Sequence, residues 1–148
     1  MSDDLVFLIC NNSVIPFWLL LVVAPRSVWT RRLVHSGLFA AMLVPAYALL
    51  LFGDQPGPQG ASFFSLAGVS RIFTTPKTII ACWVHYLVFD LFVGAWIARD
   101  AARRGLAHLW TIPFLVVTLL FGPIGLGSYM LLRALKLRVL TLDERPAQ

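Results

Sequence analysis

Charged side chains are scarce in this sequence. Only 13% of its residues are Asp, Glu, Lys or Arg, whereas a soluble domain of this size carries about 25%. The apolar residues come in blocks of about twenty instead of amphipathic stripes, which is typical of a polytopic membrane protein. These features exclude an ordinary soluble domain and predict one small transmembrane domain over residues 1–148.

Residues that build disulfides and covalent active sites are also few. The two cysteines, Cys10 and Cys82, both lie in apolar segments and are interpreted as packing residues, so they define no disulfide framework. The sequence contains no nucleotide-binding glycine loop, no nucleophile elbow and no histidine-rich desaturase-type box. It therefore indicates none of the enzyme classes that these motifs define.

Positive charge exceeds negative charge, with a formal net charge of +5. The basic residues flank the apolar runs, which favours membrane topology and contact with anionic lipid over binding of nucleic acid. The acidic start of the chain and the length of its first apolar run indicate no cleavable signal peptide. With no transit peptide either, we expect an integral protein of a bacterial inner membrane.

Four hydrophobic segments are long enough to span a bilayer as helices, namely residues 5–24, 33–52, 78–98 and 109–132. Residues 61–75 are too short and too polar to span, so we predict an interfacial or re-entrant helix between the second and third spans. Thr75 and Pro76 are expected to be the N-cap and first residue of the third span. The predicted fold is an all-α bundle of four transmembrane helices.

Four spans place both chain termini on one side of the membrane. The short basic loops after the first and third spans favour a cytoplasmic position for those loops, which would place the termini in the periplasm. The basic segment after the last span argues for the opposite orientation, with Arg133, Lys136, Arg138 and Arg145 on the other side. The sequence therefore leaves the orientation open.

The third span carries two ionisable residues near its middle, His85 and Asp90. Such groups cost several kcal/mol in hydrocarbon unless something satisfies them, so they are functional candidates. Five residues of an α-helix turn through about 500°, so the two side chains point about 140° apart. They do not form a direct pair, but one elongated ligand lying along the helix could contact both.

The sequence leaves two roles open for each of these residues. Asp90 is either a structural partner of Arg71 or Thr118, or an acid or base, because burial disfavours an ionised carboxylate. His85 is either a satisfied interior residue bonded to Asn12, or a group for proton transfer or axial ligation. A metal site would need further ligands, and the other histidines lie at helix ends, so we predict no metal.

Antiparallel spans can be aligned in depth by counting about 1.5 Å per residue from their midpoints. Polar or helix-breaking features of the other spans then fall near the level of His85: Asn12, Pro45 and the break at 121–123. Thr118 falls near the level of Asp90. Such features indicate either an intramembrane pocket or a tightly packed bundle.

Several motifs occur together along the chain: N-x-x-V-I-P-F-W at 11–18, G-x-x-R-I-F at 68–73, W-V-H-Y-L-V-F-D-L-F at 83–92 and F-G-P-I-G at 121–125. With these motifs the chain resembles the neoxanthin-synthase-like family, whose plant members are abscisic-acid-deficient-type chloroplast proteins. The resemblance covers residues 11–132, and W-x-H-x-x-x-x-D-L-F is its most specific part.

The resemblance implies a cofactor-independent isomerase that acts on violaxanthin or on a related carotenoid, retinoid or isoprenoid. In the family reaction an epoxide opens and a neighbouring carbon loses a proton, so one group donates a proton and another accepts one. Matched onto this chain, Asp90 is the acid and His85 the base, or the reverse. The other expected site residues are Asn12, Trp18, Arg71, Trp83, Tyr86, Phe89, Thr118 and Phe121.

Other functions stay open at this point. The chain could bind a carotenoid, retinoid or quinone without catalysis, or serve as an accessory subunit of a partner membrane enzyme. A homo-oligomer is compatible with either role. A channel or transporter is a weaker hypothesis, because the spans carry few ionisable groups.

Overall fold

The computed structural model describes residues 1–53 and 57–142, and this part of the chain is helical and contains no strand. Arg145, one of the charges considered for orientation, lies outside the described residues. Four stretches are long and apolar enough to cross a membrane: Asp3–Val23, Thr30–Phe52, Pro76–Arg103 and His108–Leu135. The predicted all-α fold with four spans is confirmed.

The chain divides into two compact units. The first unit comprises residues 1–14 and 39–88. Its helices are α1 (Asp3–Ser13), nearly all of α3 (Leu38–Phe52), α4 (Leu66–Ile72) and the first half of α5 (Pro76–Arg103). The second unit comprises residues 15–38 and 89–148. Its helices are α2 (Ile15–Val23), the π-helix η1 (Thr30–Val34), the second half of α5 and α6 (His108–Leu135).

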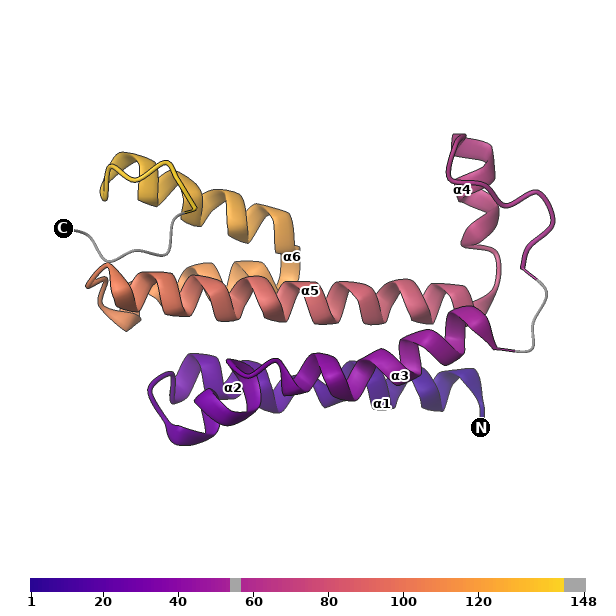
Figure 1. The fold of residues 1–148 in the computed structure, drawn as a ribbon, viewed down its shortest axis with the longest axis horizontal. Coiled ribbons are helices and arrows are strands. Elements are labelled where there is room, and N and C mark those ends of the chain that lie inside the picture. The colour runs from indigo at the N-terminus through magenta and orange to yellow at the C-terminus, as the bar shows by residue number, and fades with distance from the viewer. Residues whose placement is uncertain (54–56, 143–148) are drawn as a thin grey trace. The chain divides into compact units, whose positions relative to one another are not determined.

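The short helix between the second and third spans is present but shorter than predicted. The Ser65 hydroxyl accepts a hydrogen bond from the Gly68 N–H at 3.0 Å, which caps α4, so residues 61–65 stay outside the helix. Figure 1 shows α4 turning away from the line of α5. The start of α5 is as predicted, since the Thr78 N–H donates to the Thr75 hydroxyl at 3.3 Å and the helix begins at Pro76.

The first span is interrupted where its proline predicts a kink. Helix α1 ends at Ser13 and α2 begins at Ile15, one residue before Pro16. Pro16 has no N–H to donate to the carbonyl of Asn12, four residues earlier. The Ser13 hydroxyl donates to the carbonyl of Cys10 at 2.7 Å, which satisfies one backbone group at the end of α1.

The second span begins with a π-helical turn that the sequence does not predict. Its first residue, Thr30, is fully buried. The Thr30 hydroxyl donates to the carbonyl of Ala24 at 2.6 Å, and the Thr30 N–H donates to the Ser27 hydroxyl at 3.0 Å. These bonds tie the start of η1 to the end of α2, so the span begins at Thr30 instead of Leu33.

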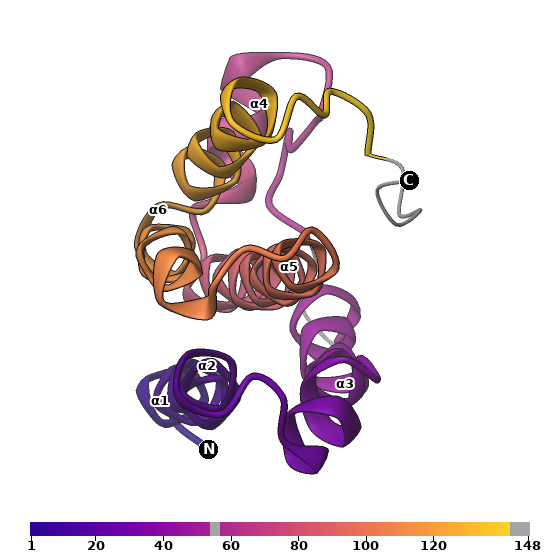
Figure 2. The ribbon, with the colours of Figure 1, turned by 90° about the vertical axis from the view of Figure 1, so that its left-hand side faces the viewer.

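Helix α6 bends at the predicted break, as Figures 1 and 2 show. Phe121 has non-helical backbone angles, φ −145° and ψ 51°. Pro123 follows, and its missing N–H removes a helical hydrogen bond to the residue four positions earlier. The Thr118 hydroxyl donates to the carbonyl of Phe114 at 2.7 Å in the turn before the bend.

Close helix approach in the second unit depends on a glycine. A Cβ atom at Gly94 would collide with the indole of Trp18, so this ring lies directly against the backbone of α5. Large apolar side chains remain exposed along the spans, among them Leu49, Phe52 and Leu120. Exposed apolar side chains on helices of this length are expected where lipid is the solvent.

Candidate functional site

Asp90 lies against the bend of α6, within the second unit. A Cβ atom at Gly122 would collide with the Asp90 carboxylate, so the glycine allows this side chain to reach the backbone next to Phe121. Asp90 is half-buried. Its carboxylate has no hydrogen bond or ion pair with any other described residue of the second unit. Buried polar groups normally have partners, so this arrangement requires an explanation.

Asp100, ten residues further along the same helix, has the opposite surroundings. It is 1% exposed. Its carboxylate accepts hydrogen bonds from the Arg104 Nε at 3.0 Å and from the Tyr129 hydroxyl at 2.8 Å. The Arg133 Nε forms an ion pair with it at 3.0 Å, and the Arg103 Nη2 lies 3.6 Å away. This cluster fully engages Asp100, so its role is structural.

The cluster includes residues that sequence reasoning missed. Arg133 was grouped with a basic segment leaving the last span, but it is 0% exposed. Its guanidinium lies 5.3 Å from the Trp96 ring centroid, and its Nη2 donates to the carbonyl of Thr141 at 2.7 Å. No local pattern could have identified this pairing, because Asp100 and Arg133 are far apart in sequence and lie on different helices.

His85 lies in the first unit, on an exposed face of α5. Its ring centroid is 6.2 Å from that of Tyr47 on α3, with the two planes inclined by 37°. Two residues earlier on α5, the Trp83 Nε1 donates to the Asn11 side-chain oxygen at 2.9 Å. Asn12, the predicted site residue, is exposed and accepts from the Asn11 amide at 3.4 Å. Asn11 is therefore the asparagine that positions Trp83.

The other predicted ligand-contacting residues lie in varied surroundings. Tyr86 and Phe89 are more than half exposed, as is Phe121 at the bend of α6. Trp18 is buried against Gly94. Thr118 is fully buried and its hydroxyl is engaged by the helix backbone. Arg71 is exposed on α4, where its guanidinium lies against Gly60.

The level at which the break in α6 lies along α5 differs from the level predicted by counting residues from the span midpoints. Counting from the midpoints placed the break of the fourth span near the level of His85, whereas the structure places Gly122 against Asp90. The two positions on α5 are about 7.5 Å apart along the helix axis. Both helices are longer than the predicted spans, α5 from Pro76 to Arg103 and α6 from His108 to Leu135, so the midpoints of both move and bring Gly122 toward the level of Asp90.

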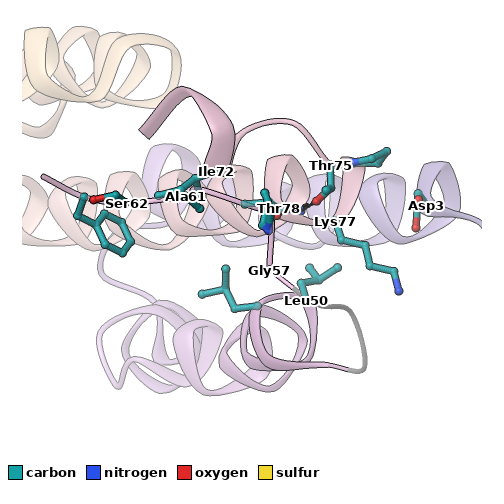
Figure 3. A pocket seen from close by; sticks show the side chains of 13 residues that line it. Asp3, Leu50, Gly57, Ala61, Ser62, Ile72, Thr75, Lys77 and Thr78 are labelled. Carbon is teal, nitrogen blue, oxygen red and sulfur yellow. Dashed lines mark hydrogen bonds between the residues drawn. The ribbon is translucent and has the colours of Figure 1, made fainter. Parts of the chain in front are cut away.

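Each of three cavities is lined by residues of a single unit. The first, of about 420 Å³, lies in the first unit, and Figure 3 shows Leu50, Lys77 and Thr78 among the side chains around it. The second, of about 280 Å³, and the third, of about 310 Å³, lie in the second unit. Neither His85 nor Asp90 lines any of these three cavities, so the intramembrane pocket stays a prediction.

Within residues 1–53 and 57–142, no group of three His, Cys, Asp or Glu side chains is placed to hold a metal ion.

Comparison with known proteins identifies one family and one relative. The model of the family described as ABA DEFICIENT 4-like matches residues 5–129. The protein named ABA DEFICIENT 4, chloroplastic, from Arabidopsis thaliana is 27% identical over 137 residues, which cover 88% of this chain. The match spans 61% of the length of that relative. Comparison with solved structures found no match.

Proposed function

The chain belongs to the ABA DEFICIENT 4-like family, as its motifs predicted, and from this premise we propose that it acts on a carotenoid-like isoprenoid within the membrane. The proposed activity is a cofactor-independent isomerisation of the neoxanthin-synthase type. Its substrate would be a hydrophobic polyene that enters from the lipid. The proposed location is a bacterial inner membrane, with lipid as the surrounding partner.

The observation that carries this proposal is the contrast between the two aspartates of α5. Asp100 is held by arginines and a tyrosine, whereas Asp90 lies at mid-span beside a break in α6 with no such partner in its unit. An acidic side chain that is costly in hydrocarbon and has no structural hydrogen bond or ion pair in its unit is a candidate for chemistry. Phe89 and Phe121, the chain neighbours of Asp90 and Gly122, are more than half exposed, and aromatic side chains suit a conjugated substrate.

The proposed reaction balances without an oxidant or reductant. Asp90, in its protonated form, donates its proton to the epoxide oxygen as the bond from this oxygen to C6 breaks. A base removes the proton from C7, and the electrons of that C–H bond form the second double bond of the allene. The products are an allene and a tertiary alcohol with the same atoms as the substrate.

His85 is the proposed base. It lies about 7.5 Å from Asp90 along the axis of α5. An acid and a base must each come within about 3 Å of the atom that they serve. A separation of this size therefore leaves room for a substrate that lies along the helix and contacts each group in turn.

Turnover of a defined substrate tests the proposal. The full chain would be placed in lipid nanodiscs with violaxanthin, and the products would be separated by liquid chromatography. General acid–base groups contribute about 10²–10⁴-fold, so Asp90→Asn and His85→Ala should each lower the rate by at least about 100-fold. Asp4→Asn, which removes a carboxylate at the exposed start of α1, should leave it unchanged.

The outcomes separate catalysis from binding. Normal conversion by both Asp90→Asn and His85→Ala would show that the assigned chemistry is wrong. Polyene absorption bands in freshly purified protein without any turnover would support the alternative, a carotenoid, retinoid or quinone binder or an accessory subunit. A colourless preparation from a host that makes carotenoids would count against both.

A further inference from the structure

The second unit contains a basic cavity that the proposed chemistry does not use. It has a volume of about 280 Å³. Its charged and titratable lining residues are Arg26, Arg31, His35, Arg99 and His108. No aspartate or glutamate is among the described residues that line it. We refer to this feature as the basic cavity.

Two histidines of the basic cavity are held in fixed positions. The Arg99 Nη1 lies 3.2 Å from the Nδ1 of His35. Because a guanidinium can only donate, Nδ1 is the acceptor and His35 carries its proton on Nε2, which remains a donor. The Nε2 of His108 donates to the carbonyl of Val22 at 2.8 Å. These bonds join the second span, α5, α6 and α2 around the cavity.

The other two arginines supply charge that the protein does not neutralise. Arg26 and Arg31 are both exposed, and neither side chain forms a hydrogen bond or ion pair with any described residue. At the inner wall, the hydroxyl of Thr111 is buried and has no hydrogen-bond partner in the described chain. Unpaired guanidinium groups beside a histidine N–H are the donors that bind oxyanions, and arginine does so with two parallel bonds.

The position and size of the cavity indicate its occupant. Arg26 follows the end of α2, Arg99 lies in the last turns of α5 and His108 begins α6, so the cavity lies where apolar spans end. Lipid headgroups occupy this depth in a bilayer, and basic pockets between transmembrane helices bind them. A volume of about 280 Å³ is at the lower limit for a drug-sized ligand, and suits a small anion rather than a polyene.

We propose that the basic cavity is a binding site for a phosphate group, with Arg26, Arg31 and the Nε2–H of His35 as donors. The phosphate belongs to the headgroup of an anionic membrane lipid or is free phosphate from solution. The two sources share one chemistry, and the experiment distinguishes them. Neither Asp90 nor His85 lines this cavity, so the proposal does not depend on the proposed isomerisation.

Lipid retention by the purified full chain tests the proposal. Protein in a neutral detergent would receive phosphatidylglycerol or phosphatidylcholine, and bound lipid would be counted by native mass spectrometry. The wild type should retain one phosphatidylglycerol. Hydrogen bonds to charged groups are strong enough that Arg31→Gln and Arg26→Gln should each weaken this binding at least about tenfold.

Arg32→Gln is the matched control. Arg32 is next to Arg31, is exposed and does not line the cavity, so this variant has the same change of net charge. It should retain the lipid as the wild type does. Equal losses in the Arg31 and Arg32 variants would attribute binding to general surface charge and overturn the proposal. Arg31→Lys, which keeps the charge but loses the two-pronged geometry, should bind with intermediate affinity.

A second arm uses inorganic phosphate alone. Displacement of phosphatidylglycerol by millimolar phosphate, or phosphate-dependent thermal stabilisation that Arg31→Gln loses, would assign the site to a free anion. Retained phosphatidylglycerol that phosphate does not displace would assign it to a lipid headgroup. If the wild type neither retains phosphatidylglycerol nor responds to phosphate, the proposal is wrong. Circular dichroism of each variant checks that the helices are still formed.

Discussion

Replacing Asp100 by Asn should severely destabilise the second unit. Three arginines and a tyrosine converge on the Asp100 carboxylate, and the substitution removes its charge while keeping its shape. Arg133 is 0% exposed, so it cannot turn to solvent when its partner is lost. The result is a buried positive charge without compensation.

The structure gives the size of the effect. Removing one partner from a buried ion pair costs about 3–5 kcal/mol, mainly because the other charge stays buried. Arg103 and Arg104 are 28% and 7% exposed, whereas Arg133 is 0% exposed, so their charges can regain water more readily than that of Arg133. We therefore expect Asp100→Asn to lower the free energy of unfolding by about 3–5 kcal/mol, with most of the loss due to Arg133.

A double substitution isolates this cause. If the penalty is the stranded guanidinium, adding Arg133→Met to Asp100→Asn should recover at least half of the lost stability, because an apolar side chain can replace a buried charge at little cost. Denaturant unfolding of the full chain in micelles, followed by helical circular dichroism, measures all variants. Asp90→Asn makes the same chemical change on the same helix and should shift stability by less than about 1 kcal/mol.

Two results would refute the reasoning about Asp100. One is an Asp100→Asn variant within about 0.5 kcal/mol of the wild type, the usual range of surface substitutions. The other is a double variant no more stable than the single one, which would show that Arg133 is not the group left uncompensated.

Three further predictions use the same preparation. Gly122→Ala places a methyl group against the Asp90 carboxylate, so it should cost about 1–3 kcal/mol in unfolding free energy and lower turnover. A Cβ atom at Gly127 meets no neighbouring atom, so Gly127→Ala should instead stabilise α6 by up to about 1 kcal/mol. Equal effects of the two substitutions on stability would contradict the close packing of Gly122 against Asp90. Tyr129→Phe removes one bond to Asp100 and should cost about 1.5–3 kcal/mol, and an unchanged unfolding midpoint would count against that bond.

The features of this fold that have a local cause are predictable from the sequence. The four spans follow from the length of apolar runs, and the helix interruptions near Pro16 and Pro123 follow from a missing N–H. Thr75 and Pro76 predicted the start of α5 because a cap and a fixed φ angle act on the next turn of the same helix.

Features whose cause is a contact between distant residues are not predictable in this way. A basic run at the end of a span is typical of topology, so the sequence assigns Arg133 to the basic exit of the last span and not to a buried aspartate. The shortened α4 and the π-helical start of the second span have local causes, the cap at Ser65 and the bond from Thr30 to Ala24, which a count of apolar residues does not register. Composition and periodicity carry no information about such contacts.

The separation of the two aspartates bears on which catalytic role Asp90 would take. The nearest cation that α5 itself provides is Arg99, nine residues and about 13.5 Å further along the helix, whereas Asp100 has arginines within one turn. An ionised carboxylate with no counter-charge nearby on its own helix is costly in an apolar medium. Asp90 would therefore meet a substrate as a proton donor, which favours the assignment of acid to Asp90 and base to His85 over the reverse.

A counter-charge introduced one turn away, as in Gly94→Lys, would favour the ionised form of Asp90 and should abolish turnover. Gly94→Ala, which adds only bulk against Trp18, controls for packing. Equal turnover in these two variants would remove the electrostatic basis of the assignment.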